Sequence, residues 1–184
     1  MRGVNVDWRG MTGFDLPAVE RIAAAVYPGH CESAEVLAER RVLYHDGAYV
    51  LEVGERIAGY ILSHPWRLDD PPAFDSLVHH LPDNADTYYI HDIALLPVAR
   101  RIGAASQIVE GLIKHAAAGS FRSVSLVAAN RSASFWIRFG FAVEEMGKMK
   151  KKLLSYDADA RYMVRRFTQE DSRPSRNLRY QMHD

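Results

Sequence analysis

The stretch HDIALLPVARRIGAASQIVEGL, residues 91–112, constrains the fold more than any other part of the chain. A run of strand-forming residues ends at Pro97, two arginines follow, and Gly103 opens a helix whose apolar residues recur at intervals of three and four. A helix start leaves backbone N–H groups without acceptors and carries a partial positive charge, so it favours an anion, above all a phosphate. Small residues after Gly103 keep this start free of bulk. We interpret the stretch as a strand that leads into a pyrophosphate cradle.

Other common sites do not fit the sequence. The cradle is not a P-loop, because no Gly-Lys-Ser/Thr ends it, and it is not a dinucleotide fingerprint, because the repeated glycines are missing. His79 and His80 have no Cys or carboxylate partner at ligand spacing, so we expect no metal site. Ser106 sits in no nucleophile-elbow pattern and is expected to offer its backbone amide to phosphate.

The rest of the chain predicts one mixed α/β domain. Helices are predicted over residues 14–29, 32–44, 103–119 and 130–140, and strands over 4–11, 48–53, 56–64, 87–95, 123–128, 141–146 and 160–167. The strands around Gly54 and Glu55 read as a hairpin. In the helix after Gly103 one apolar face is predicted, made by Ala105, Ile108, Val109, Leu112, Ile113 and Ala116. Residues 68–86 read as a long loop, with room for one short helical turn, whose length suggests a role beyond connection.

Charge gives no general signature of nucleic-acid or membrane binding. The chain has 184 residues, 48% of them hydrophobic, and Lys plus Arg equals Asp plus Glu at 23 each. From Gly147 onward there are ten basic and five acidic residues, so this part is near +5 and the remainder near −5. We interpret Lys148 and Lys150–Lys152 as solvated surface and expect no nucleic-acid partner. Attachment of nucleic acid through this basic part, which contains Tyr156 and Tyr162, remains a rival interpretation.

The cellular setting is predicted from two absences in the sequence. Cys31 is the only cysteine, which rules out an intramolecular disulfide and fits a reducing compartment. No apolar stretch approaches the ~18 residues of a membrane span, and the first ten residues lack the apolar core of a signal peptide. We therefore expect a cytoplasmic protein with no membrane partner.

At the cradle the sequence resembles the GNAT superfamily of acyl-CoA-dependent N-acyltransferases. The pyrophosphate motif of that family reads Gln/Arg-x-x-Gly-x-Gly/Ala, and Arg100, Gly103 and Ala105 stand at its fixed positions. Downstream, NRSASFWIRFGF at residues 130–141 resembles the family block Asn-x-x-Ala-x-x-Phe-Tyr-x-x-x-Gly-Phe. The order of elements over residues 4–167 also matches, so the resemblance covers nearly the whole chain.

The resemblance implies a fold and a domain division. The expected fold is mixed α/β (α+β), with a mostly antiparallel central sheet flanked by helices and splayed at the strand that ends near Leu95. An N-acetyltransferase domain is expected over residues 1–167. Residues 168–184, which show no periodicity, are expected to form a flexible tail.

The resemblance also implies where acetyl-CoA, the expected co-substrate, binds. Backbone groups near Ile93 and Leu95 would pair with the pantetheine arm, and a backbone N–H near Leu95 would polarise the thioester carbonyl. Amides from Arg101 to Ser106 would hold the pyrophosphate, and Asn130 and the helix after it would flank the thioester. The full expected set is Ile93, Ala94, Leu95, Arg100, Arg101, Ile102, Gly103, Ala104, Ala105, Ser106, Asn130, Phe135 and Trp136. Alternatively, Asn130 caps the following helix, and Phe135 and Trp136 are core aromatics.

The chain departs from the family pattern at Trp136, where many members have a tyrosine that protonates the departing thiolate. Indole cannot serve as that acid. A thiol of pKa ~8.5 makes release of the thiolate near pH 7 unfavourable by only ~2 kcal/mol, whereas freeing an alkyl amine of pKa ~10.4 costs about 4.6 kcal/mol. A missing acid is therefore easier to tolerate than a missing base.

His91 is the candidate base. Period-two alternation predicts that Tyr89, His91, Ile93 and Leu95 share one face of the strand and that Asp92 points to the other. An imidazole of pKa near 6.5 suits removal of a proton at neutral pH. The arrangement is similar to that of the arylalkylamine N-acetyltransferases, which carry one histidine at the position of His91 and another at the position of Tyr89. Only the first of the two is present in this chain. Asp92 is the second candidate, and a structural histidine is the alternative for His91.

These observations together predict an N-acetyltransferase that moves an acetyl group from acetyl-CoA to a primary amine by direct attack in a ternary complex. The acceptor is left open between a small amine, a polyamine, an amino acid and a protein amine. Residues 27–32 and the loop 68–86 are expected to shape its pocket. The alternative function is a catalytically idle acyl-CoA-binding sensor, and a homodimer stays open as the oligomeric state.

Overall fold

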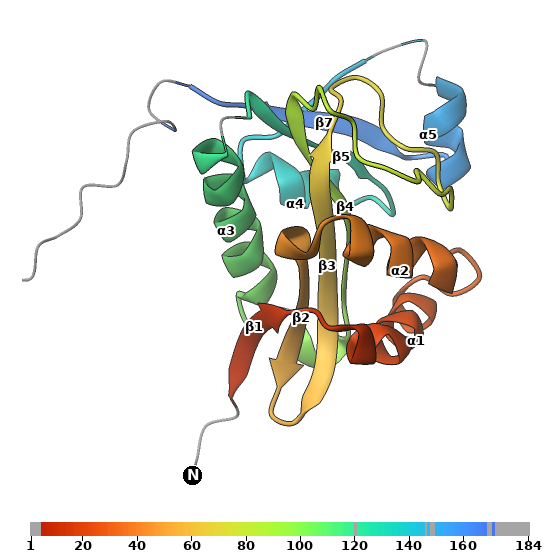
Figure 1. Cartoon of the computed structure of the whole chain (residues 1–184), viewed down its shortest axis with the longest axis vertical. Coiled ribbons are helices and arrows are strands. Elements are labelled where there is room, and N and C mark those ends of the chain that lie inside the picture. The colour runs from red at the N-terminus through yellow and green to blue at the C-terminus, as the bar shows by residue number, and fades with distance from the viewer. Residues whose placement is uncertain (1–4, 120, 146, 148–149, 169–170, 172–184) are drawn as a thin grey trace, which may run out of the picture.

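The computed structural model of this chain describes residues 5–119, 121–145, 147, 150–168 and 171. Its strands form one sheet in the order β1-β2-β3-β4-β5-β7-β6, in which only β4 and β5 pair in parallel (Figure 1). The strands are β1 Val6–Gly10, β2 Ala48–Val53, β3 Arg56–Trp66, β4 Thr87–Leu95, β5 Ser123–Ala128, β6 Ala142–Val143 and β7 Arg161–Arg166. The helices are α1 Leu16–Val26, α2 Ala34–Leu43, α3 Ala104–Ala118, α4 Ala133–Ile137 and α5 Lys150–Tyr156. The predicted fold class is confirmed.

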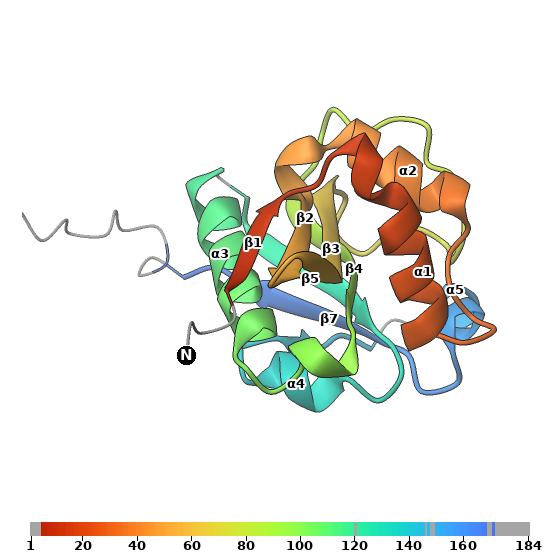
Figure 2. The ribbon, with the colours of Figure 1, turned by 90° about the horizontal axis from the view of Figure 1, so that it is seen from below.

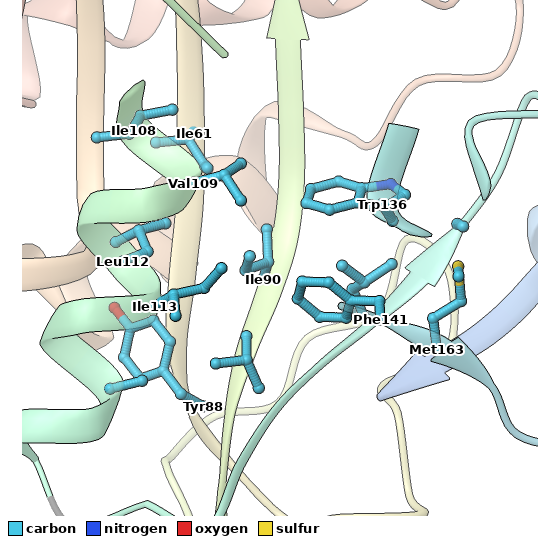
Figure 3. Close-up of a cluster of buried hydrophobic side chains, with 14 residues drawn as sticks. Ile61, Tyr88, Ile90, Ile108, Val109, Leu112, Ile113, Trp136, Phe141 and Met163 are labelled. Carbon is cyan, nitrogen blue, oxygen red and sulfur yellow. The ribbon is translucent and has the colours of Figure 1, made fainter. Parts of the chain in front are cut away.

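Helices cover both faces of the sheet, as the view in Figure 2 shows. On one face, α1 and α2 pack on Val50, Tyr60 and Leu62 of the central strands. On the other face, α3 packs on Ile61, Tyr88 and Ile90, and Trp136 of α4 and Phe141 join the same cluster (Figure 3). The buried face of α3 is the predicted one except at its start, where Ala104 is buried in place of Ala105.

The central strands β4 and β5 part midway along the sheet. They pair only from Tyr88 to Ile90, after which β4 continues along β3 to Leu95 while β5 continues along β7 to Ala128. The predicted splay is thus present. In a regular sheet the facing backbone N–H and C=O groups of neighbouring strands bond to each other. Where two strands separate, these groups lose their partners, so an extended ligand can bind there.

A β-bulge in β4 changes the predicted faces of the strand. The pairing with β3 shifts between Leu62 and Ser63, so that β4 advances two residues, from Ile90 to Asp92, against one on β3. An extra residue at a bulge breaks the period-two alternation. Consequently Ile93 packs with the cluster under α3, whereas His91 and Asp92 both bond to groups on the side of α1 and α2. The predicted sharing of a face by His91 and Ile93 is wrong.

The chain after β6 also differs from the sequence expectation. Residues 150–156, for which no element was predicted, form α5 and fold back over the loop between β3 and β4. Lys150 and Lys151 are exposed, as predicted, whereas Lys152 is half-buried. Lys152 pairs with Asp70 at 2.6 Å, and the hydroxyl of Tyr156 donates to the carbonyl of Pro72 at 2.8 Å. The loop itself contains no helical turn. Of the predicted tail, residues 169–170 and 172–184 lie outside the described residues, as does Lys148.

Candidate active site

The start of α3 is open and shaped for an anion. Arg101 and Gly103 both have left-handed backbones, with φ of +62° and +84°, and the first helical bond runs from the Gln107 amide to the Gly103 carbonyl at 3.0 Å. The amides before Gln107 therefore have no helical acceptor. No atom lies within 4 Å of the position that a Cβ on Gly103 would take. This concave run of free amides fits the pyrophosphate of coenzyme A.

Side chains around the cradle fix its position rather than fill it. The indole of Trp8 donates to the Ala104 carbonyl at 2.9 Å and ties the helix start to β1. Arg100 turns back, and its Nε donates to the Leu95 carbonyl at 2.9 Å. The carbonyl of Ile93 accepts a bond from the Tyr27 hydroxyl at 2.6 Å. Since a carbonyl oxygen has two lone pairs, both carbonyls can still accept a bond from a pantetheine amide.

A cavity of about 200 Å³ lies at the separation of β4 and β5. One wall comes from β5, α4 and the residues between them, including Asn130, Phe135 and Trp136. The other wall comes from the segment after α1, the β3–β4 loop and the end of α5. His91, Asp92 and Ile93 form the edge between the two walls. The two segments predicted to shape a pocket, residues 27–32 and 68–86, therefore both contribute to it.

Glu32 and His91 form a hydrogen-bonded pair at this edge. Nε2 of His91 lies 2.7 Å from Oε2 of Glu32, and the two side chains are only 1% and 6% exposed. Burial alone would raise the pKa of Glu32, but the charge and the hydrogen bond of His91 outweigh it and hold that pKa below its ordinary value. Glu32 is therefore a carboxylate at neutral pH. Nδ1 of His91 is buried with no partner within the described part of the chain.

Asp92 belongs to a second buried group. Its carboxyl accepts a hydrogen bond from the Tyr60 hydroxyl on β3. Burial and the nearby Glu32 carboxylate raise its pKa to about 6, although the Tyr60 bond opposes the shift. Asp92 is thus partly protonated near neutrality, and it can hold or release a proton beside the cavity.

Tyr89 lies behind His91 rather than in the cavity. Its ring is 6.1 Å from that of His91 and 5.7 Å from that of His64, and it is buried. Burial, together with the repulsion from His91, lowers the pKa of His64 to about 3, so this imidazole is neutral. A direct role of Tyr89 toward a bound amine would need contact with the cavity, and the structure gives it none.

The residues that follow β5 combine structural and lining roles. Asn130 is not the cap of α4, because Ser132 holds that position; instead Asn130 has a left-handed backbone and donates its amide to Asp157 at 2.6 Å. Trp136 is 4% exposed, and its indole donates to Ser132 Oγ at 3.3 Å. Both residues also line the cavity. Trp136 is thus a core residue that borders this space, and a role of either residue toward acetyl-CoA stays a prediction.

Sequence reasoning named the segments of Glu32 and Phe74 without giving either residue a role, and it missed Tyr156 as a residue of the cavity. Glu32 stands 59 positions from His91, and no spacing rule links the two. Phe74 and Tyr156 come from a loop and from the helix α5 that was not predicted. The one sequence signal that pointed to these residues was the length of the loop 68–86, which suggested a role beyond connection.

The described residues contain no group of three or more His, Cys, Asp or Glu side chains that could hold a metal ion. Within the same residues, no helix has both the length and the apolar character needed to cross a membrane.

Comparison with known proteins places this geometry in a family. A sequence model described as "Acetyltransferase (GNAT) family" matches residues 16–141. No curated protein sequence matches the chain significantly. Many solved structures share the fold at low sequence identity, and three of them illustrate its range.

The second of these three is an N-acetyltransferase by name. Naa20 from Chaetomium thermophilum, in complex with a bisubstrate analogue, is 19% identical with a TM-score of 0.67, covering 90% of this chain and 88% of that one. The ribosomal-protein-S18-alanine N-acetyltransferase of Escherichia coli is 16% identical with a TM-score of 0.62, covering 95% and 99%. The GphF GNAT-like decarboxylase in complex with isobutyryl-CoA is 14% identical with a TM-score of 0.73, covering 87% and 98%.

Proposed function

Because the chain belongs to the GNAT acetyltransferase family, we propose that it transfers an acetyl group from acetyl-CoA to a primary amine by direct attack in a ternary complex. The observation that carries this proposal is the Glu32–His91 pair on the wall of the cavity where β4 and β5 part. Acetyl-CoA would supply the acetyl group already activated as a thioester. The residues of this chain bind it, orient the amine and take up the proton.

The binding of acetyl-CoA is assigned to the cradle and the splayed strands. Amides from Arg101 to Ser106 would hold the pyrophosphate, and β4 from Ile93 to Leu95 would pair with the pantetheine arm. Asn130, Phe135 and Trp136 would form the opposite wall. The fit of the open helix start to a phosphate supports this assignment.

The proton of the amine is assigned to the Glu32–His91 pair acting as a unit. An alkyl ammonium of pKa ~10.4 must lose a proton before it attacks, at a cost of about 4.6 kcal/mol near pH 7. The Glu32 carboxylate attracts the ammonium, and the imidazole bonded to it at 2.7 Å offers a second site for the proton. Asp92, whose pKa is about 6, is a further proton carrier at the same edge.

The alternative of an idle acyl-CoA sensor is not supported. The only support for a sensor is the presence of Trp136 where many family members have the tyrosine acid. The burial of this indole and its edge-on packing against Phe135 and Phe141 explain Trp136 as a core residue. Loss of the usual tyrosine acid costs the reaction only ~2 kcal/mol, because a thiol of pKa ~8.5 is itself a reasonable leaving group near neutrality.

The proposal is tested by incubating the protein with acetyl-CoA and a panel of primary amines. Released coenzyme A is measured by chromatography, so that the thiol of Cys31 does not contribute, and acetylated products are identified by mass spectrometry. We expect product with at least one amine and none with Gly103→Asp. Binding of acetyl-CoA without product from any amine would contradict the proposed function.

A further inference from the structure

The turn between β5 and α4 forms part of the cavity wall and has an unfavourable backbone conformation. Asn130, which lines the cavity, and Arg131 are consecutive and both left-handed, with φ of +52° and +59°. For residues other than glycine this conformation carries a steric cost, smaller for Asn than for Arg. Within the segment, the Ser132 amide bonds to the Ala129 carbonyl at 3.0 Å. Contacts from outside the turn are needed to keep two such residues in place.

Asp157, 27 positions further along the chain, supplies such a contact. Its Oδ2 accepts a hydrogen bond from the Asn130 amide at 2.6 Å, and its Oδ1 accepts one from the Asp159 amide at 2.7 Å. A hydrogen bond to a carboxylate is about twice as strong as one between neutral groups. The other contact joins Arg131 and Asp159 at 3.3 Å, and because their side chains are 87% and 53% exposed it stabilises the turn little. The bond from Asn130 to Asp157 therefore holds the turn.

The position of Asp157 is fixed by α5, which ends one residue before it. The Asp157 amide bonds to the Leu153 carbonyl at 3.4 Å, and the Tyr156 hydroxyl donates to the Pro72 carbonyl at 2.8 Å. The helix is thereby anchored to the loop between β3 and β4, against which it lies in Figure 1. Because Tyr156 and Asn130 line the same cavity from opposite walls, Asp157 connects these two walls where α5 ends.

From this arrangement we propose that Asp157 is a positioning residue for the binding of coenzyme A, because it holds the left-handed turn at Asn130 and Arg131 against which the pantetheine arm would lie. The inference rests on the proposed function, which places that arm between β4 and the residues after β5. Asp157 does not line the cavity, so it acts through the turn. Without its carboxylate, a fraction of the molecules leaves the left-handed conformation, and the affinity for coenzyme A falls accordingly.

Calorimetry with coenzyme A tests this role without any transfer of an acetyl group. We expect Asp157→Ala to raise the Kd of coenzyme A by roughly three- to tenfold, because it removes a charge-assisted hydrogen bond. Asp157→Asn keeps an acceptor oxygen and should raise the Kd less, by about two- to threefold. Asp159→Ala removes the same charge two residues away, keeps the backbone amide that bonds to Asp157, and should not raise the Kd.

The sign of the change separates positioning from general electrostatics. Coenzyme A is an anion, so loss of a negative charge by itself would leave its Kd unchanged or lower it. An unchanged or lower Kd for Asp157→Ala, in protein shown to be folded by circular dichroism, would overturn the proposal. If Asp157→Ala does not fold, the same result for Asp157→Asn would overturn it.

A rescue experiment identifies the turn as the element on which Asp157 acts. Arg131→Gly removes the steric cost of the left-handed conformation, so in this background Asp157→Ala should change the Kd by no more than about twofold. Arg131→Ala removes the same charge and the same pair with Asp159 but keeps the Cβ that causes the cost. In that background Asp157→Ala should keep its full effect. Equal effects of Asp157→Ala in the two backgrounds would contradict the proposal.

The binding measurements also separate this inference from the proposed function. Binding of coenzyme A that depends on Asp157, without acetylation of any amine, would contradict the proposed function and support the positioning role. Acetylation by a protein whose affinity for coenzyme A does not respond to Asp157→Ala would do the reverse. A wild-type protein that does not bind coenzyme A would overturn both.

Discussion

The Glu32–His91 pair should lose its function as a unit when either member is changed. The two side chains are buried, their N···O distance is 2.7 Å, and both line the cavity. Glu32→Gln and His91→Gln each remove one titrating group and keep a polar side chain of similar size. The effects of mutating two groups that act together are not additive. The acetylation rate of the double variant should therefore be only slightly lower than that of the less active single variant.

The size of the effect follows from the proton that must be moved. A general base contributes typically 10² to 10⁴ in rate, which is about 2.7 to 5.4 kcal/mol of activation free energy and brackets the ~4.6 kcal/mol needed to free an alkyl amine at pH 7. At pH 9 the same deprotonation costs only about 1.9 kcal/mol. The deficit of His91→Gln should therefore shrink as the pH rises, by up to about tenfold per unit.

The assay is the rate of acetylation between pH 6.5 and 9, at saturating acetyl-CoA, with CoA affinity measured in parallel. His64→Gln removes an equally buried imidazole that does not line the cavity, so its profile should keep the wild-type slope. A wild-type rate for His91→Gln at neutrality, a deficit that does not change with pH, or fully additive losses in the double variant would refute the reasoning. Asp92 would then become the first candidate for the base.

Three further outcomes are expected. Gly103→Asp should sharply weaken CoA binding measured by calorimetry, because it adds a carboxylate at an open left-handed position. Gly111→Asp, farther along α3, should not weaken it. Equal affinity of the two variants for CoA would show that the pyrophosphate does not bind at the start of α3. Trp136→Phe should lower stability to urea by about 1–3 kcal/mol through lost packing and keep the alkaline limb of the pH–rate profile; loss of that limb would give the indole a chemical role. The pKa of Asp92 rises from 3.8 to about 6 on folding, so the native state binds the extra proton, and the contribution of Asp92 to stability should fall as the pH rises from 3 to 7, by about 3 kcal/mol. Asp92→Asn should lack this fall in urea titrations at the two pH values, and parallel curves for both proteins would contradict the assigned pKa.

The sequence by itself determined those features whose causes are local. The hairpin depends on two strand-forming runs around Gly54 and Glu55, and the buried face of α3 depends on spacing within one helix. The pyrophosphate cradle is local as well, since its donors are backbone amides of consecutive residues and its opening needs only a residue such as Gly103 that accepts a positive φ. The separation of β4 from β5 could be predicted from the resemblance to the family, because the family motifs are short contiguous stretches that can be recognised in the sequence.

The tertiary structure alone decided the chemistry of the acceptor side. The bulge at His91 breaks the alternation that a regular strand would impose, and it arises from the pairing with β3 rather than from any residue type within β4. Glu32 reaches His91, and Phe74 meets His30 and Tyr156, only because α1, the β3–β4 loop and α5 close over the same end of the sheet. Contacts between residues tens of positions apart depend on how elements pack, and packing leaves no periodic trace in the sequence; the cradle could therefore be read from residues 100–106, whereas the pocket for the amine could not.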